Sequence, residues 1–362
     1  MTALRFACVA VSLLVAVGGR PASAVTVNWV SVGDPGNPND TTGYGAVADS
    51  FRIMAHEWTN ARYVEFLNAV DPDGTNPNSI YSSSMGSDAR GGITYFAGNS
   101  NGTKYVAKTN MGDKPVNYVS WLDAARVANW LQAGATTYAD STSGSTAINS
   151  GAYTLNGVTS GTAPAKNPGA QYWIPAESEW YKAAYYKASG TNAGYWQYAT
   201  QATGTAPLAV GATVVGTGTL SGVSPVISGN FANFDSAAIW NNQTGNVTSV
   251  GTNGGPSAYG TFDQGGNVDE WMALDNAASP YGGLRGGRWF DSASNLTSSY
   301  RNASSPANEF DYIGFRLAGS PSSPSGVPEI DPGSATGVIA LIGGALACLE
   351  RRRGRRSRAC LT

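Results

Sequence analysis

Cysteine is nearly absent from this sequence of 362 residues, and its three copies, Cys8, Cys348 and Cys360, lie close to the two ends. The long stretch between them therefore has neither a disulfide bond nor a thiolate that could bind a metal ion. Histidine is rarer still, with His56 as its one copy. One imidazole cannot build the multi-histidine sites that zinc, copper and non-heme iron favour, so no copper or iron is expected.

Charge is also scarce, because only 13% of the residues are Asp, Glu, Lys or Arg. Between residues 25 and 328 the acidic residues outnumber the basic ones by 21 to 14. A surface of that sign repels a phosphate backbone, which excludes a nucleic-acid partner. Tyrosine (18) and tryptophan (10) are abundant instead. They predict a core of large aromatic side chains whose OH and NH groups need hydrogen-bond partners.

The first 24 residues have the features of a secretory signal peptide. Arg5 precedes an apolar run over residues 6–17, and the small residues 22–24 form a cleavage site. The apolar run is too short to cross a bilayer of about 30 Å, which favours a signal peptide over a membrane anchor. We therefore expect export, with a mature chain that begins near Val25.

Residues 327–362 contain three features in a fixed order: Val327-Pro328-Glu329, the uncharged stretch 333–349, and a run of arginines. This order resembles the PEP-CTERM sorting tail of bacterial exported proteins, although Ile330 replaces the second proline of that motif. The resemblance implies an exosortase-like partner, a hydrophobic transmembrane helix over 333–349, and delivery to the cell surface or extracellular matrix. A plain C-terminal membrane anchor is the alternative. A flexible linker is expected at 319–326.

Between the two ends, the apolar spacing predicts three helices. Residues 50–70 have the pattern of a strand and then a helix that begins near Thr59 or Asn60. A second helix is expected within 114–134 after Ser120, and a third within 172–187. The stretches 133–170 and 199–230 are rich in Gly, Ser, Thr and Ala and lack an apolar period. They are expected to be surface insertions.

Five segments resemble the formylglycine-generating enzyme, or sulfatase-modifying factor, family. In chain order they are HEWTNARYVEFLNAV, KPVNYVSWLDAARVANWL, YWIPAESEWYKAAYY, FDQGGNVDEWM, and the series RGGRW, SYR and IGFR within residues 285–316. One such motif is weak, but five in the family's order are specific. The resemblance covers residues 25–318. It implies one irregular α+β domain, low in regular secondary structure and related to the C-type-lectin fold.

The resemblance also implies bound calcium, which takes six or more oxygen ligands from carboxylates and backbone carbonyl groups. A first ligand set would comprise Asp263, Gly266, Val268 and Glu270, with Gly266 and Val268 contributing carbonyl oxygens. A second set would comprise Asn233, the carbonyl oxygen of Phe234, and Asn242. The alternative for the first set is a turn in which Glu270 accepts backbone N–H bonds.

Family members that oxidise a cysteine bind copper through two cysteines a few residues after R-G-G-x-W. In this chain those places fall near Asp291 and Leu296, and neither residue is a soft ligand. We therefore expect the redox chemistry of the family to be lost. The alternative is an oxidoreductase that acts on protein substrates through an unrecognised metal site.

Residues 285–316 then have two interpretations. Arg285, Arg301 and Arg316 are expected to be structural, each pairing with carboxylates or carbonyl groups. The functional interpretation is a groove for a glycan or peptide, because aromatic rings stack on the ligand and short polar side chains give fixed hydrogen bonds. Its residues would be Arg288, Trp289, Asp291, Asn295, Tyr300 and Asn302. The sequence thus predicts an exported, calcium-supported binding protein without catalytic residues.

Overall fold

The chain forms short helices and many short strands. A computed structural model describes residues 27–135, 148–210, 214–220, 229–274 and 277–321. Its helices are α1 (Asn60–Val70), α2 (Ser84–Ser87), α3 (Trp121–Gln132), α5 (Glu177–Tyr185) and the 3₁₀ helix η2 (Ala293–Leu296). Its strands are β1 (Trp29–Val32), β2 (Phe51–Met54), β3 (Ile93–Tyr95), β4 (Tyr105–Ala107), β5 (Tyr172–Trp173), β6 (Leu208–Ala209), β7 (Phe231–Ala232), β8 (Ile239–Trp240), β9 (Gln243–Thr244), β10 (Asp269–Met272), β11 (Gly282–Arg285), β12 (Asn302–Ser304), β13 (Ile313–Gly314) and β14 (Ala318–Gly319).

The three long helices begin where the sequence predicts them. The Thr59 side chain accepts a hydrogen bond from the first turn of α1. Ser120 and Asp123 form a capping box at the start of α3, each side chain accepting a backbone N–H of the other. At the start of α5 the Glu179 carboxylate accepts the Ala176 amide at 2.8 Å. Local capping chemistry therefore sets all three starts.

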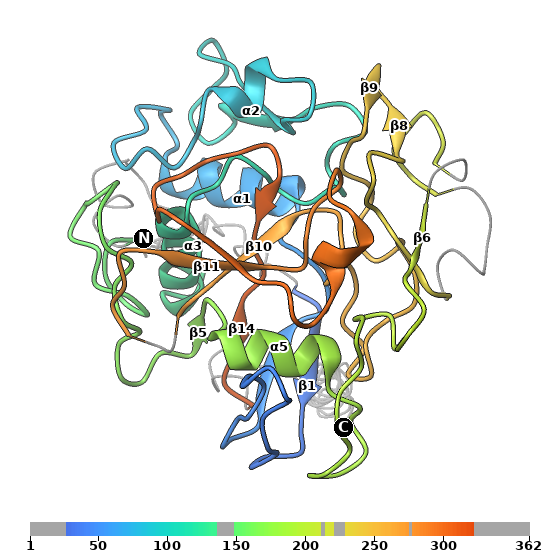
Figure 1. Ribbon diagram of the computed structural model, residues 1–362. Helices are drawn as coiled ribbons and strands as arrows, with labels where there is room; N and C mark the ends of the chain where they lie inside the picture. The colour runs from blue at the N-terminus through green and yellow to red at the C-terminus, as the bar shows by residue number, and fades with distance from the viewer. Residues whose placement is uncertain (1–26, 136–147, 211–213, 221–228, 275–276, 322–362) are drawn as a thin grey trace, which may run out of the picture. The chain divides into compact units, whose positions relative to one another are not determined.

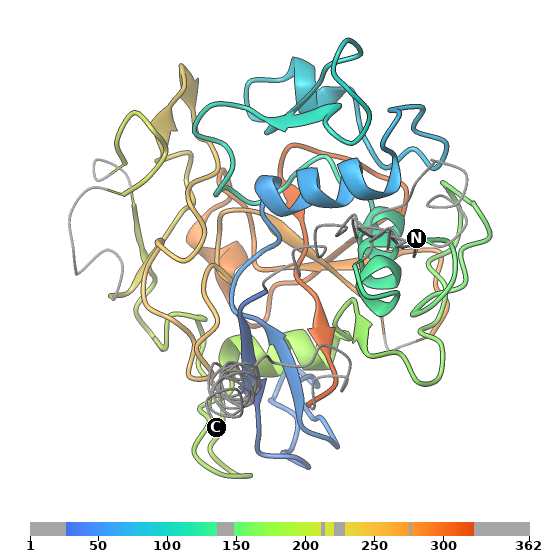
Figure 2. The ribbon, with the colours of Figure 1, turned by 180° about the vertical axis from the view of Figure 1, so that it is seen from behind.

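Two four-stranded sheets organise the fold, with strand orders β1-β2-β14-β5 and β12-β11-β10-β13. In the second sheet, β10 and β11 are antiparallel and Glu270 lies opposite Arg285. In both ribbon views α1 lies above β10 and β11, and α5 lies below them (Figures 1 and 2). The second sheet carries two of the family-like segments. Strand β10 is the last part of the FDQGGNVDEWM segment, and β11 ends at Arg285, where the segment 285–316 begins.

Aromatic side chains fill the interior, as the composition predicts. Trp58, Trp121, Trp180 and Trp271 are all fully buried. The indole nitrogen of Trp271 donates to the Val119 carbonyl oxygen at 2.9 Å. Large rings thus replace an extended sheet as the main source of packing. The described residues thus form the irregular α+β arrangement, low in regular secondary structure, that the sequence predicts.

The prediction of surface insertions is wrong for part of each stretch, since Val210 in the stretch 199–230 is buried as well. Ile148, Tyr153 and Leu155 lie in the stretch 133–170, yet they are buried in the main hydrophobic core. The Tyr153 hydroxyl accepts the Ile174 amide at 2.9 Å. These apolar residues have no helical or strand period because they reach the core from turns, so no local pattern indicates their burial. Residues 156–162, by contrast, are exposed.

The chain divides into two units, residues 1–321 and 322–362. The expected signal peptide, residues 1–24, and the expected sorting tail, residues 327–362, both lie outside the described residues. Within the described parts of the chain, no helix has the length and apolar character needed to cross a membrane.

Candidate functional site

Glu177, the first residue of α5, binds two of the arginines in the segment 285–316. Its carboxylate accepts Arg285 Nη2 at 2.6 Å and Arg301 Nη2 at 2.7 Å. Arg285 also donates from Nη1 to the carbonyl oxygens of Ser298 and Tyr300, both at 2.8 Å. One buried carboxylate thus ties the start of α5 to both ends of the 298–301 turn. The predicted structural role of these arginines is confirmed.

Arg316 is bound just as completely. Its Nε and Nη2 atoms donate to the two oxygens of Glu270 at 2.6 and 2.7 Å, and the side chains of both residues are fully buried. Its remaining donors bond the carbonyl oxygens of Met54, Ala55 and Phe262. Every N–H of the guanidinium has a partner, so Arg316 is also structural, as predicted.

Arg288 differs from Arg285 and Arg316 because it is bound between two aspartates and part of it reaches the surface. Its side chain is 16% exposed, with Nη1 3.4 Å from Asp269 Oδ2 and Nε 3.2 Å from Asp291 Oδ1. Burial raises the pKa of Asp269 to about 7; Arg288 opposes this shift and Asp291 adds to it. Asp291 Oδ2 is buried without a hydrogen-bond partner in the described structure. The cluster therefore holds more acceptors than its arginine satisfies.

Four aromatic side chains next to Arg288 contact one another in a chain that we call the aromatic ridge: Trp289, Phe290, Tyr312 and Phe310. Phe310 stacks on Tyr312 with ring centroids 5.1 Å apart, and Phe290 meets Tyr312 edge to face at 5.3 Å. The Arg288 guanidinium lies 4.1 Å from the Tyr312 ring centroid. Phe290 and Phe310 are each 38% exposed. The ridge thus offers two apolar ring surfaces to a ligand.

Arg90 extends this site from a distant part of the sequence. Its guanidinium lies 4.4 Å from the Trp289 ring centroid and 3.8 Å from Asp311 Oδ2. It also donates to the carbonyl oxygens of Thr244 and Gly245, at the end of the β8–β9 hairpin.

Sequence reasoning missed five residues of this site: Arg90, Asp269, Phe290, Phe310 and Tyr312. The three aromatic residues within residues 285–316 were a signal that could have been used. No local sequence pattern, however, indicates that aromatic rings about 20 residues apart in the chain contact each other. Arg90 and Asp269 lie outside that segment, so no spacing within it could have identified them.

Of the predicted groove residues, the structure brings Arg288, Trp289 and Asp291 together. Asn295 lies on η2, where its Oδ1 accepts the hydroxyl groups of Ser292 and Ser294. Asn302 is exposed on β12 and pairs in register with Leu284. Tyr300 lies between them in the chain, partly exposed. The structure therefore gives no support for including Asn295, Tyr300 and Asn302 in one groove with the aromatic ridge.

The two positions to which the resemblance assigns the copper-binding cysteines have different surroundings. Asp291 is 8% exposed and bound to Arg288. Leu296 is fully buried in an apolar cluster with Tyr198, Ala232 and Phe234. One place holds a hard carboxylate and the other a hydrocarbon side chain, so neither supplies a ligand suited to Cu(I).

The first implied calcium set has oxygen donors that suit calcium, but the positive charge of Arg316 competes with an ion for Glu270. Glu270 already binds Arg316, and Asp263 accepts the Gly251 amide and the Asn253 side chain. Glu57 adds a third buried carboxyl group whose Oε2 has no hydrogen-bond partner in the described structure. Burial raises the pKa of Glu57 well above its usual value, and Asp263 raises it further. Glu57, Asp263 and Glu270 thus place carboxyl oxygens near the Arg316 guanidinium, and such oxygens are the ligands that a hard cation prefers.

Such a cation would need backbone oxygens as well. Among the described residues, no three acidic, histidine or cysteine side chains are grouped so that they could hold a metal ion by themselves. Gly266, one expected carbonyl donor, has φ +84°, and a Cβ there would lie 2.3 Å from the Asn233 carbonyl oxygen. Only glycine permits that approach, which places Gly266 of the first implied set against Asn233 of the second.

The second set is only partly assembled. Asn233 is buried and its Oδ1 is unpartnered in the described structure, as an oxygen ligand would be. The carbonyl oxygen of Phe234 accepts the Ala237 amide, and Asn242 lies exposed at the turn of the β8–β9 hairpin. Asn246 lies closer, since Asn233 Nδ2 donates to its carbonyl oxygen at 2.9 Å. Asn233 thus fits a calcium ligand, whereas the surroundings of Asn242 give no support.

Comparison with solved structures finds distant similarities. Variable protein 1 from Treponema denticola is 17% identical, with a TM-score of 0.44. The match covers 81% of the present chain and 95% of the Treponema denticola chain. CarF is 19% identical, also with a TM-score of 0.44, covering 82% and 99%. PvdO from Pseudomonas aeruginosa is 15% identical with a TM-score of 0.36, covering 81% and 92%. No curated protein matches the chain in sequence.

A family model described as "Sulfatase-modifying factor enzyme 1-like domain" matches residues 37–321. That span contains both four-stranded sheets except β1, all the helices of the described residues, and the whole of the Arg288 cluster. It also matches the resemblance carried by the five sequence motifs. The chain therefore belongs to the family of sulfatase-modifying factor enzyme 1-like domains.

Proposed function

We propose that this chain is an exported binding protein whose sulfatase-modifying-factor-like domain binds a glycan or a peptide and carries out no thiol oxidation. The observation that carries the proposal is the pair of side chains at the two positions where the resemblance places copper ligands. Asp291 pairs with Arg288 at one position, and Leu296 is buried among apolar side chains at the other. A redox metal that prefers thiolates has no ligand at either place.

The aromatic ridge supports a binding role. Its exposed rings can stack on the apolar face of a sugar or on a peptide side chain. Beside them, Arg288 and Asp291 supply a donor and an acceptor in fixed positions, because a hydrogen bond and ring contacts hold the Arg288 guanidinium. Apolar area next to a few convergent polar groups is the usual composition of a ligand site.

Calcium would support this domain structurally. Asp263 and Glu270, with the carbonyl oxygens of Gly266 and Val268, are the residues that would hold a first ion, and Asn233 with Phe234 those that would hold a second. A bound cation would place positive charge beside the carboxylates of Asp263 and Glu270. Binding to the folded state alone would raise the stability of the domain.

Export and surface display belong to the same proposal. The signal peptide expected over residues 1–24 and the sorting tail expected over 327–362 support delivery by an exosortase-like machinery to the cell surface or matrix. At the cell surface, a site that binds an extracellular glycan or peptide would be useful without any catalytic activity. The competing candidate is a family-type oxidoreductase acting on protein substrates through another metal set, which the family membership itself favours.

Truncating the ridge tests the binding role. We expect the double variant Phe290→Ala/Phe310→Ala to weaken binding on a glycan and peptide array by about tenfold or more, because two stacking surfaces are lost. Phe96→Ala is the matched control, since Phe96 is 47% exposed next to the β3–β4 hairpin. Equal losses in both variants, or no array binding by the wild-type chain, would contradict the proposal.

A further inference from the structure

An aspartate–proline peptide bond lies in the loop that follows β1, next to the helix α5. Asp34 and Pro35 form this bond, and Pro35 is exposed to solvent. In both ribbon views the loop passes beside α5 (Figures 1 and 2). Lys182, which lies on α5, donates from Nζ to the carbonyl oxygen of Asp34 at 2.8 Å. The carbonyl group of the Asp34–Pro35 bond therefore faces a positive charge.

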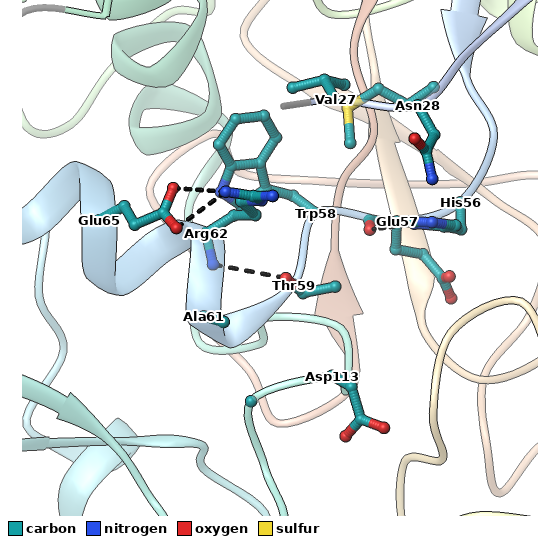
Figure 3. Close-up of a pocket in the computed structure, with 12 residues that line it drawn as sticks. Val27, Asn28, His56, Glu57, Trp58, Thr59, Ala61, Arg62, Glu65 and Asp113 are labelled. Carbon is teal, nitrogen blue, oxygen red and sulfur yellow. Dashed lines mark hydrogen bonds and ion pairs between the residues drawn. The ribbon is translucent and has the colours of Figure 1, made fainter. Parts of the chain in front are cut away.

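Lys182 lacks the carboxylate partner that a buried cation usually has. Its side chain is fully buried, and the Asp34 carbonyl oxygen is its one hydrogen-bond acceptor among the described residues. Ordinary pairing is seen beside the first turn of α1, where Arg62 Nη1 donates to both oxygens of Glu65 at 2.8 Å (Figure 3). Taking an ammonium group out of water costs free energy, and one backbone carbonyl group offsets little of that cost. The position of Lys182 is therefore not explained by stability.

The backbone of Asp34 is strained at this bond. Its φ is +51°, in the left-handed region, where the Cβ of any residue other than glycine is crowded. The ring of a following proline also disfavours folded conformations of the residue before it, and Asp34 precedes Pro35. Strain of this kind persists only where surrounding contacts hold it, and it is typical of functional sites. Cleavage of the Asp34–Pro35 bond would release it.

The Asp34 carboxyl group is held close to the same bond. The Tyr259 hydroxyl donates to Asp34 Oδ2 at 2.9 Å and to the Gly33 carbonyl oxygen at 3.3 Å. No described residue donates to Asp34 Oδ1, so this oxygen is available as a nucleophile. A carboxyl oxygen of aspartate that attacks the carbonyl carbon of its own residue closes a five-membered ring. The two reacting groups therefore need no binding step to meet.

We propose that the chain cuts itself at the Asp34–Pro35 bond. Asp34 Oδ1 forms a bond to the Asp34 carbonyl carbon, and the Lys182 ammonium group stabilises the negative charge that develops on the carbonyl oxygen. The C–N bond then breaks, and its electron pair goes to the proline nitrogen, which takes a proton from water. Water opens the cyclic anhydride and leaves two carboxyl groups on Asp34. One water molecule is consumed overall, and no oxidant or reductant takes part.

Cleavage would leave β1 in its sheet without a covalent link to the rest of the domain. β1 pairs with β2 from Trp29 opposite Met54 to Val32 opposite Phe51. Val32 is fully buried in the main hydrophobic core. The segment before Pro35 would therefore stay bound in the native protein and separate only on denaturation. This activity does not depend on the binding role proposed for the aromatic ridge.

Mass spectrometry of the full chain under denaturing conditions tests the proposal. The purified protein is incubated at about pH 6, because burial lowers the pKa of Lys182 to about 8 and the side chain is charged below that value. We expect a fragment that begins at Pro35 to accumulate at a first-order rate that is independent of protein concentration. An uncut wild-type chain, or a rate that rises with protein concentration, would overturn the proposal.

The Asp71–Pro72 bond is an internal control in the same molecule. Its carbonyl oxygen accepts the neutral backbone amide of Gly74 at 3.1 Å, and the φ of Asp71 is −133°. We expect the Asp34–Pro35 bond to be cut about a hundredfold faster than the Asp71–Pro72 bond, as for one added donor to a developing oxyanion. Equal rates at both bonds would show only the general acid lability of aspartate–proline bonds and would contradict the assignment.

Two variants identify the groups that act. Lys182→Met is expected to slow the cut about a hundredfold, because it removes the donor to the carbonyl oxygen. It leaves no carboxylate without its partner, so the fold is retained. Lys187→Met is the matched control, since the Lys187 ammonium group lies over the Trp196 ring, and it should cut at the wild-type rate. Asp34→Asn, which tolerates a positive φ, should not cut. A wild-type rate in Lys182→Met or in Asp34→Asn would contradict the mechanism.

Discussion

Replacing Arg316 with methionine is expected to lower the free energy of unfolding by about 3–5 kcal/mol, the usual cost of removing one partner from a buried ion pair. Glu270 would stay fully buried, with Trp180 as its remaining side-chain donor among the described residues. Glu57 and Asp263 interact with the charge of Arg316, so both would also lose that attraction. Urea unfolding followed by tryptophan fluorescence measures the change.

The double variant Arg316→Met/Glu270→Gln separates charge from packing. Without the carboxylate, this pair of positions holds no buried charge, and we expect the double variant to recover much of the lost stability. If Arg316→Met alone costs less than about 1 kcal/mol, the buried pair does not hold the fold together.

Glu177→Ala is the second large effect, with an expected cost of about 3 kcal/mol or more. The change removes the charged partner of both Arg285 and Arg301. Arg285 would stay buried, its guanidinium 4.8 Å from the Tyr44 ring centroid, without the carboxylate that balances its positive charge. The first turn of α5 would also lose an acidic residue that favours its positive end.

Arg301→Ala is the matched control. The Arg301 side chain is 46% exposed, whereas Arg285 is 1% exposed. We expect a cost of only about 1 kcal/mol for Arg301→Ala, since water can replace an exposed partner. Thermal unfolding of the two variants side by side measures both. A larger loss in Arg301→Ala than in Glu177→Ala would contradict the assignment of Glu177 as the common anchor.

The parts of this fold that could be predicted from the sequence are those set by local chemistry. Thr59 and Ser120 cap their helices through hydrogen bonds within three residues, so the spacing of polar and apolar residues reveals the helix starts. Arg288, Trp289 and Asp291 are near neighbours in sequence, and a short turn is enough to place them together. The paired arginines were predictable as structural because a buried guanidinium requires carboxylate or carbonyl partners.

The rest depends on contacts between distant segments. Arg90 reaches Trp289 from a segment almost 200 residues earlier in the chain, and Asp269 meets Arg288 only because β10 and β11 are neighbours. Tyr153 joins the core from a turn without an apolar period. No local pattern in the sequence encodes these contacts.

We propose that this domain keeps the architecture of its family but does not oxidise thiols. Elemental analysis of the purified chain, together with oxygen consumption on a cysteine-containing peptide, tests this proposal. We predict calcium as the bound metal, no stoichiometric copper or iron, and no thiol-dependent oxygen consumption. A transition metal bound at one equivalent that turns over the peptide thiol would contradict the account.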